Sequence, residues 1–194
     1  MDLTPLQKKL AVGIPTAIVL INLAGMWWYN HEPDLFDPVD SAKRHAAAHG
    51  HAAATGFATT SALIDVTEVL LTKRGGYLSN DIMPPWVLLD NVPNWEFGAL
   101  TQMRDLARAM RNDFSRSQTQ SAADPDLEEA DPLYHYDSGR WIPPATEGRY
   151  RKAQEHLEAY LARLTDPAQP DAQFYARADN LADWLSIVEK RLGS

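Results

Sequence analysis

The sequence contains no cysteine, and this absence excludes several classes of site at once. Disulfide bonds, thiolate zinc sites, iron–sulfur clusters and thiol nucleophiles all require cysteine side chains. An excess of basic residues is also missing, because 18 lysines and arginines face 26 aspartates and glutamates, which gives a formal charge of −8. Since nucleic acid binding depends on basic side chains that neutralise phosphates, we do not expect a nucleic acid partner.

Sequence motifs of known catalytic mechanisms are missing as well. No GxSxG, SxxK or HExxH motif occurs in the chain. The glycine pair Gly75-Gly76 lacks the Lys-Ser/Thr that a phosphate-binding loop needs. The sequence therefore predicts a protein that is not an enzyme and uses no cofactor.

An uncharged apolar run occupies residues 10–29, LAVGIPTAIVLINLAGMWWY. A helix of this length spans about 30 Å, the thickness of the hydrocarbon core of a bilayer. The preceding tail, residues 1–9, carries two lysines, whereas acidic residues follow the run, which predicts a cytoplasmic N-terminus. Three aromatic residues are expected to anchor the helix at the outer membrane interface: Trp27, Trp28 and Tyr29.

A cleaved signal peptide is the main alternative for this run, because it also has a basic start and an apolar middle. Cleavage requires small residues directly after the apolar run, and bulky aromatic residues stand there instead. The first stretch of small residues, at 46–48, lies far beyond the end of the run. These flanks favour a transmembrane helix, with the rest of the chain exported to the periplasm.

The exported part is acidic and its pattern is helical. Residues 30–40 are acidic and proline-rich, which predicts a short linker, and residues 41–194 are predicted to form an all-α domain because no useful apolar–polar alternation occurs. Without Asp2, Lys8 and Lys9, 25 acidic and 16 basic residues remain, and 16 − 25 gives a charge of −9. A domain this acidic should not bind anionic lipid by charge.

Two helices are predicted on either side of a long loop. Apolar residues recur every three or four positions over residues 59–74, and Gly75-Gly76 is expected to end this helix in the left-handed conformation. Residues 77–93 contain a proline pair and no clear period, which predicts an ordered, apolar-rich loop. The next helix is expected to begin after an N-cap at Asn94 and to carry its apolar face to Phe114.

A stretch rich in serine, acidic residues and proline, at about 115–145, is predicted to be an irregular excursion. Thr146 is expected to cap another helix, which Asp166-Pro167 ends. The last helix carries an apolar seam that begins at Phe174 and ends at Leu192. Two neighbouring amphipathic helices joined by a short turn predict an antiparallel C-terminal hairpin.

Three histidines form the most pointed candidate for a metal site. If residues 41–49 are helical, His45 and His49 lie on one face at i, i+4, and His51 can join them through Gly50. Against this reading, no nearby glutamate completes an HExxH motif. A solvated, pH-sensitive helix surface is the alternative interpretation.

Five residues are candidates for partner binding. Three arginines spaced three or four positions apart could present a cationic stripe to a carboxylate or phosphate, and two tryptophans belong to residue types that dominate interfaces. The candidates are Trp86, Trp95, Arg104, Arg108 and Arg111. A solvated helix face and a place in the domain's own core are the competing interpretations.

Two segments carry a resemblance to a known family: LLTKRGGYLSNDIMPPWVLLDNVPNWEFGALTQMRDLARAMRNDFSRSQ at 70–118 and AQFYARADNLADWLSIVEKRLGS near the end. The sequence resembles the bacterial domain-of-unknown-function family numbered 2333. The resemblance implies a Gram-negative protein anchored in a membrane by one N-terminal helix, with no assigned activity and no catalytic residues. It also implies longer members that continue past the equivalent of Ser194, so a natural end and a truncation both fit the final helix.

We expect a non-enzymatic single-pass protein of the bacterial inner membrane whose periplasmic domain binds or scaffolds other envelope components, with protein partners in the membrane or periplasm. An accessory subunit of a larger membrane complex is the first alternative, held partly through Gly13, Asn22 and Gly25. An envelope hydrolase acting through carboxylates such as Glu96 and Asp81 is the second alternative.

Overall fold

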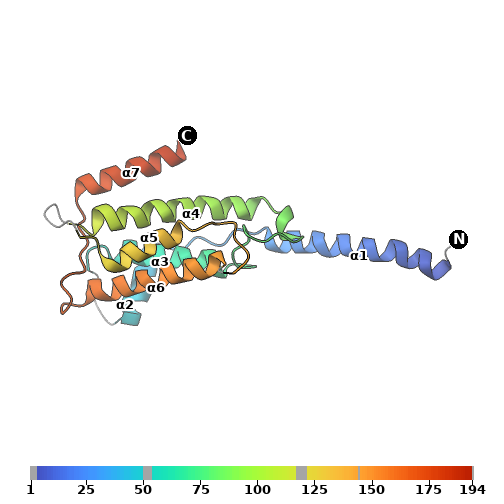
Figure 1. Cartoon of the computed structure of the whole chain (residues 1–194), viewed down its shortest axis with the longest axis horizontal. Helices are drawn as coiled ribbons and strands as arrows, with labels where there is room; N and C mark the ends of the chain where they lie inside the picture. Colours follow the sequence, from blue (N-terminus) through green and yellow to red (C-terminus); the bar gives the residue numbers. More distant parts are fainter. Residues whose placement is uncertain (1–3, 50–53, 117–121, 144, 194) are drawn as a thin grey trace.

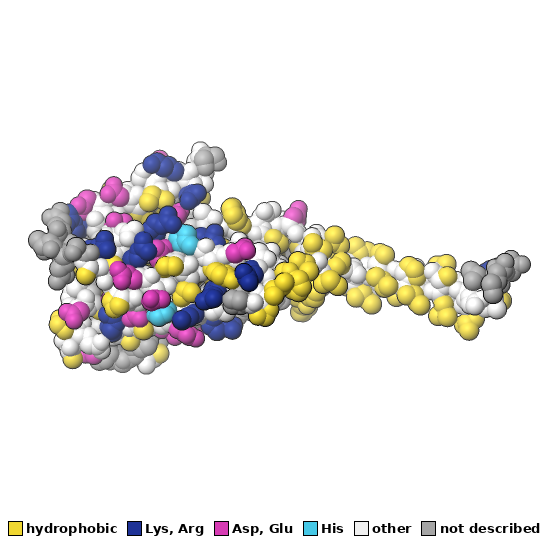
Figure 2. All heavy atoms as spheres, viewed as in Figure 1, with side chains coloured by type: hydrophobic (Ala, Val, Ile, Leu, Met, Phe, Trp, Pro, Cys, Tyr) yellow, Lys and Arg dark blue, Asp and Glu magenta, His cyan; other side chains and the backbone are white. Residues whose placement is uncertain are grey.

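The computed structural model describes residues 4–49, 54–116, 122–143 and 145–193, and in these ranges the chain forms seven α-helices and no strand. The all-α fold class is confirmed. Figure 1 shows α1 as a long rod that projects from a bundle of the remaining helices. Figure 2 shows that hydrophobic side chains cover the visible length of this rod, whereas charged side chains are spread over the bundle.

Helix α1 (Pro5–Tyr29) starts at a capping box, in which the Thr4 backbone N–H donates to Gln7 Oε1 at 2.8 Å and the Gln7 backbone N–H donates to Thr4 Oγ1. None of its residues is buried. Within the described ranges it is the one helix long and apolar enough to cross a membrane or to serve as a signal sequence.

Helix α2 (Pro38–His49) begins inside the predicted linker, so the segment without regular structure ends at Asp37. The Asp37 carboxylate accepts a hydrogen bond from the Val39 N–H at 2.7 Å and so starts the helix earlier than expected. Helix α3 (Phe57–Thr72) follows and packs against α2. Beyond its end, Gly75 and Gly76 adopt φ angles of 85° and 73°, the left-handed conformation that was predicted.

Helix α4 (Asn91–Ala109) begins three residues before Asn94, which is therefore not its N-cap. Pro93 lies in the first turn, where a missing N–H costs nothing, and this explains why the proline does not delay the helix. The helix continues into a π-helical turn, η2 (Met110–Phe114). Its predicted apolar face is confirmed, because Leu100, Met103 and Phe114 are buried.

Helix α5 (Pro125–Tyr134) corrects the prediction of an irregular excursion over 115–145. Its start is well specified: Pro125 occupies the first helical position, and the Asp124 carboxylate accepts hydrogen bonds from two backbone N–H groups of the first turn. Leu127 and Tyr134 are buried on one side of it. Acidic residues and Pro132 obscure this short apolar stripe in the sequence.

Helix α6 (Thr146–Thr165) packs against α3 and α5. Its core-facing residues have no exposed surface: Tyr150, Ala153, Leu157, Tyr160 and Leu161. The predicted cap is wrong, because Ala145 is the N-cap and the Thr146 hydroxyl instead donates towards the backbone carbonyls of Asp137 and Arg140. The predicted end at Asp166-Pro167 is confirmed.

Helix α7 (Ala178–Leu192) contradicts the predicted C-terminal hairpin, because it packs against α4 rather than folding back on α6. The non-helical segment before α7 contacts α6 through Gln173 and η2 through Phe174. Within that segment, Phe174 stacks on Phe114 at 4.9 Å between ring centroids, and the Tyr175 N–H donates to the Phe114 carbonyl at 2.6 Å. These contacts place the start of α7 beside the end of η2, far from an antiparallel position on α6.

Candidate functional site: an apolar groove between α3, α4 and α7

The three predicted arginines share one side of α4 and η2, as expected, and all three contact the C-terminal end of α5 or the two residues that follow it. Arg104 donates to the backbone carbonyls of Tyr134 and Tyr136 at 2.7 and 3.0 Å. Arg111 pairs with Asp131 at 2.7 Å, and Arg108 lies 2.6 Å from a ring nitrogen of His135. Cations placed here complement the negative end of the α5 dipole, so the stripe binds α4 to α5 within the chain.

The histidine candidate is only partly described. His45 lies on α2 with its Nε2 atom 2.8 Å from Asp65 Oδ1 on α3, and Arg44 pairs with the same carboxylate at 2.6 Å. The His49 side chain and His51 lie outside the described residues. Among the residues that are described, no group of three His, Cys, Asp or Glu side chains is placed to hold a metal ion.

Glu96 is fully buried and fixes the start of the loop between α3 and α4. Its carboxylate accepts hydrogen bonds from the backbone N–H groups of Leu78 and Ser79 at 2.8 and 2.7 Å, from the Ser79 hydroxyl and from Lys73. Burial lowers the pKa of Lys73 against the opposing effect of Glu96. With four donors, this carboxylate is a structural tie between α3, the loop and α4.

Asp81 is half-buried beside this tie, and burial together with the negative charges of Glu147 and Glu96 raises its pKa. Glu96 and Asp81 are candidate carboxylates from the sequence, but nothing in the sequence indicates Lys73 as their partner. The two ends of the Lys73–Glu96 pair are 23 residues apart, so no helical or turn spacing indicates it.

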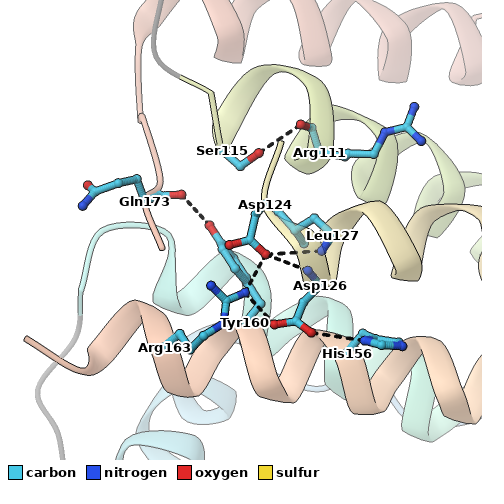
Figure 3. Close-up of polar contacts among 9 residues, drawn as sticks. All are labelled: Arg111, Ser115, Asp124, Asp126, Leu127, His156, Tyr160, Arg163 and Gln173. Carbon is cyan, nitrogen blue, oxygen red and sulfur yellow. Dashed lines mark hydrogen bonds and ion pairs between the residues drawn. The ribbon is translucent and has the colours of Figure 1, made fainter. Parts of the chain in front are cut away.

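A second polar cluster ties the start of α5 to α6 (Figure 3). Arg163 donates to Asp124 at 2.6 Å and to Asp126 at 2.5 and 3.0 Å, and His156 Nδ1 lies 3.2 Å from Asp126. Beside it, the Tyr160 hydroxyl donates to the Gln173 carbonyl at 2.7 Å. These side chains point towards one another rather than into an open cavity, so the cluster holds helices together.

An apolar groove on the other side of the bundle is the strongest candidate for a binding site. Its first part has a volume of about 320 Å³ and its second about 450 Å³, and Leu106 and Trp184 line both. Both long walls carry side chains at helical spacing, so their ridges run along the groove. Helix α3 supplies Ala62, Leu63, Val66 and Val69; α4 supplies Trp95, Ala99, Gln102, Met103 and Leu106.

Helix α7 and the segment after α1 form the edges of the groove. No residue of α7 is buried, and its apolar seam remains open to solvent, with Leu181 at 46% and Leu185 at 49% exposed. The indole nitrogen of Trp184 is buried without a hydrogen-bond partner in the described part of the chain. At the opposite edge, Leu35 is 97% exposed.

The two predicted tryptophans therefore have different places. Trp95 lines the groove, whereas Trp86 packs against Tyr29 of α1, with 5.7 Å between ring centroids. Trp184 was not singled out from the sequence. Trp184 directly precedes Leu185 of the α7 seam in the sequence. This neighbourhood is the signal from which Trp184 could have been predicted as a groove residue.

Comparison with known families assigns the chain to a family. The model of a family described as an uncharacterized protein conserved in bacteria (DUF2333) matches residues 5–194. The chain belongs to this family. The match includes α1 as well as the helical bundle, so the apolar helix is part of what family members share. No curated protein and no solved structure matches the chain.

Proposed function

We propose that this DUF2333 member is a single-pass protein of the bacterial inner membrane, with its N-terminus in the cytoplasm and its helical domain in the periplasm. In this role it is a binding protein rather than an enzyme. The helical domain takes up an amphipathic helix of a partner protein in the groove between α3, α4 and α7. The observation that carries the proposal is this groove, whose apolar walls stay open beside the unburied seam of α7.

The shape of the groove favours a helix as the occupant. Along α4 the wall runs from Trp95 to Leu106, which is about 16 Å or three helical turns. Binding of an amphipathic helix in an apolar groove relies on anchors at i, i+3, i+4 and i+7, and both walls offer complementary ridges at that spacing.

Charge indicates which helix would bind. The exported part carries −9, because 16 basic residues face 25 acidic ones. At the rim, Asp34 lines the first part of the groove, and Arg177, which pairs with Asp179, lines the second. Complementary charge speeds association and selects among partners. We therefore expect the partner helix to carry an apolar face and a basic opposite face.

The test compares three forms of the tagged protein, purified in mild detergent from native membranes and quantified by mass spectrometry. Ala99→Trp fills the groove, Ala159→Trp adds the same side chain at an exposed position on α6, and residues 1–40 alone retain only the membrane helix and linker. We expect a stoichiometric partner that the wild type and Ala159→Trp retain and that the other two forms lose.

Each other result overturns the proposal. A partner retained by residues 1–40 would make the accessory-subunit alternative correct, with binding through the membrane helix. A partner that Ala99→Trp retains would show that binding does not use the groove. No partner in any form would contradict a binding function, and hydrolase activity would then be the next function to assay.

A further inference from the structure

The loop between α3 and α4 contains a stretch that is unusual for a surface. Residues 82–89, IMPPWVLL, contain no charged or strongly polar side chain, although Asp81 and Asp90 flank them. Four of the apolar side chains are more than half exposed: Ile82 at 52%, Met83 at 63%, Val87 at 53% and Leu88 at 55%. Exposed apolar clusters of this kind mark interaction surfaces.

This loop is packed directly on the end of α1. A Cβ atom placed on Gly25 would lie 2.8 Å from Pro85 Cγ, so only glycine allows the observed approach. Met26, Tyr29 and Trp86 pack together against the buried Leu78, Leu89 and Val92. Figure 1 shows the segment between α3 and α4 beside the end of α1, and Figure 2 shows hydrophobic side chains gathered at the same junction.

The contact fixes the depth of the loop relative to α1. Gly25 lies four residues before Tyr29, which is about 6 Å along a helix axis. Trp27 and Trp28 are largely exposed at the same level, and such rings prefer the interfacial layer of a bilayer. If α1 spans the membrane as proposed above, the exposed side chains of the loop therefore lie in the interfacial layer or deeper, at the edge of the hydrocarbon core.

The backbone of the loop suits this environment. Pro84 and Pro85 have no N–H group to remove from water. The N–H groups of Val87, Leu88 and Leu89 donate to carbonyls within the loop at 3.0 to 3.2 Å. An unsatisfied N–H group is costly in lipid, and these features reduce the number that would be exposed to it.

The geometry points to the loop at residues 82–89 as a second membrane-contacting element, which inserts its apolar side chains into the outer leaflet beside α1. The inference rests on the proposed membrane span. The loop itself carries no charge, and the aspartates beside it are not attracted to anionic lipid. The contact is therefore apolar, and high salt should not weaken it. Through this contact the bundle is held against the bilayer at two places.

The absence of cysteine makes the inference simple to test, because one introduced cysteine is a unique labelling site. Full-length Val87→Cys is labelled with an environment-sensitive fluorophore and reconstituted in vesicles of phosphatidylethanolamine and phosphatidylglycerol. Quenching by doxyl-labelled lipid reports contact with the membrane, and quenching by iodide reports contact with water. Ile14→Cys in α1 is the matched lipid control, and Ala159→Cys on α6 is the matched water control.

We expect the label at Val87 to be quenched by doxyl lipid and to show several-fold weaker iodide quenching than the label at Ala159, at low and at high salt. Iodide quenching equal to that at Ala159 would place the loop in water and overturn the inference. Protection from both quenchers would show that protein covers the loop, and this would overturn it too.

The Ile14 control separates failure of the loop contact from failure of the membrane span. Doxyl quenching at Ile14 without quenching at Val87 leaves the span intact and rejects only the loop contact. No doxyl quenching at Ile14 rejects both. A second variant extends the test: with the label at Ile82→Cys, adding Val87→Asp and Leu88→Asp should abolish doxyl quenching, and retained quenching would contradict insertion of the loop.

Discussion

Helices α6 and α7 follow one another in the chain and are both amphipathic, yet their apolar faces have different surroundings. On α6 the apolar face is closed: Tyr150, Leu157 and Tyr160 have no exposed surface, and α3 and α5 cover them. On α7 no residue is buried, and Leu181 and Leu185 remain about half exposed beside α4. The apolar period thus predicts which face is apolar but does not say whether the chain itself covers that face.

The polar contacts of the two helices differ in the same way. Arg163 of α6 is 19% exposed and pairs with Asp124, which is 3% exposed. Arg191 of α7 is 53% exposed where it pairs with Asp105 of α4. Both carboxylates are buried, since the Asp105 side chain is only 9% exposed. The arginine of the α7 pair is, however, more exposed to solvent than the arginine of the α6 pair.

The sharpest test of the contrast is a pair of leucine truncations. Leu157→Ala on α6 should lower the free energy of unfolding by about 2–5 kcal/mol, because it leaves a cavity in the core. Leu185→Ala on α7 should lower it by less than about 1 kcal/mol, since the side chain is already half exposed. Urea unfolding of the full-length protein in detergent measures both. Equal losses would mean that α7 is closed in solution.

A smaller difference is expected between the two arginines. Arg163→Ala leaves Asp124 buried without its cation and should cost about 2 kcal/mol. Arg191→Ala should cost less, about 1 kcal/mol, because the Arg191 side chain is 53% exposed and water already weakens its pairing with the buried Asp105. Thermal unfolding followed by circular dichroism compares them. A larger loss for Arg191→Ala would show that the α7 contact is stronger than its exposure indicates.

The smallest effect is a pH dependence at the α7 contact. Burial, and then the charge of Asp183 on α7, raise the pKa of Asp113. A carboxyl group with a raised pKa in the folded state stabilises that state below its unfolded pKa, near 3.9, and this contribution is lost as pH rises through the folded value.

At neutral pH, Asp113→Asn should therefore slow hydrogen exchange in α7, and the difference from the wild type should vanish below about pH 4. The backbone carbonyl of residue 113, which accepts a hydrogen bond from Asn180 at 2.6 Å, is unchanged by the substitution. Exchange measured by mass spectrometry on peptides from α6 serves as the control. A difference that persists at low pH would assign the effect to something other than this charge.

Local patterns predicted the helices well where the apolar stripe is long. The faces of α3, α4 and α6 lie where the sequence places them, and Gly75 and Gly76 follow the end of α3 in the left-handed conformation. Short or interrupted patterns failed. In α5 the prolines and acidic residues conceal a ten-residue helix, although Asp124 and Pro125 form a readable start signal.

Contacts between distant segments were beyond the sequence. The segment between α6 and α7 is positioned by the stacking of Phe174 on Phe114. No spacing rule links these two residues. The sequence indicates Trp95 and the apolar seam of α7, both of which belong to the groove. It does not indicate that α3, α4 and α7 come together to form the groove. The accessory-subunit alternative assigned Gly25 to a neighbouring protein, yet Pro85 of the same chain occupies that position. Gly13 has nothing within 4 Å of a Cβ position.

The packing of the loop on α1 also couples the bundle mechanically to this helix. Pro85 lies against Gly25, and the Arg74 guanidinium lies 4.9 Å above the Trp28 ring, so α1 and the bundle should tilt together. Transmembrane helices tilt by about 20° on average, and over the length of α4, about 28 Å, such a tilt displaces the far end of the groove by about 10 Å. If α1 spans the membrane as proposed, its tilt would therefore shift the groove sideways over the membrane surface.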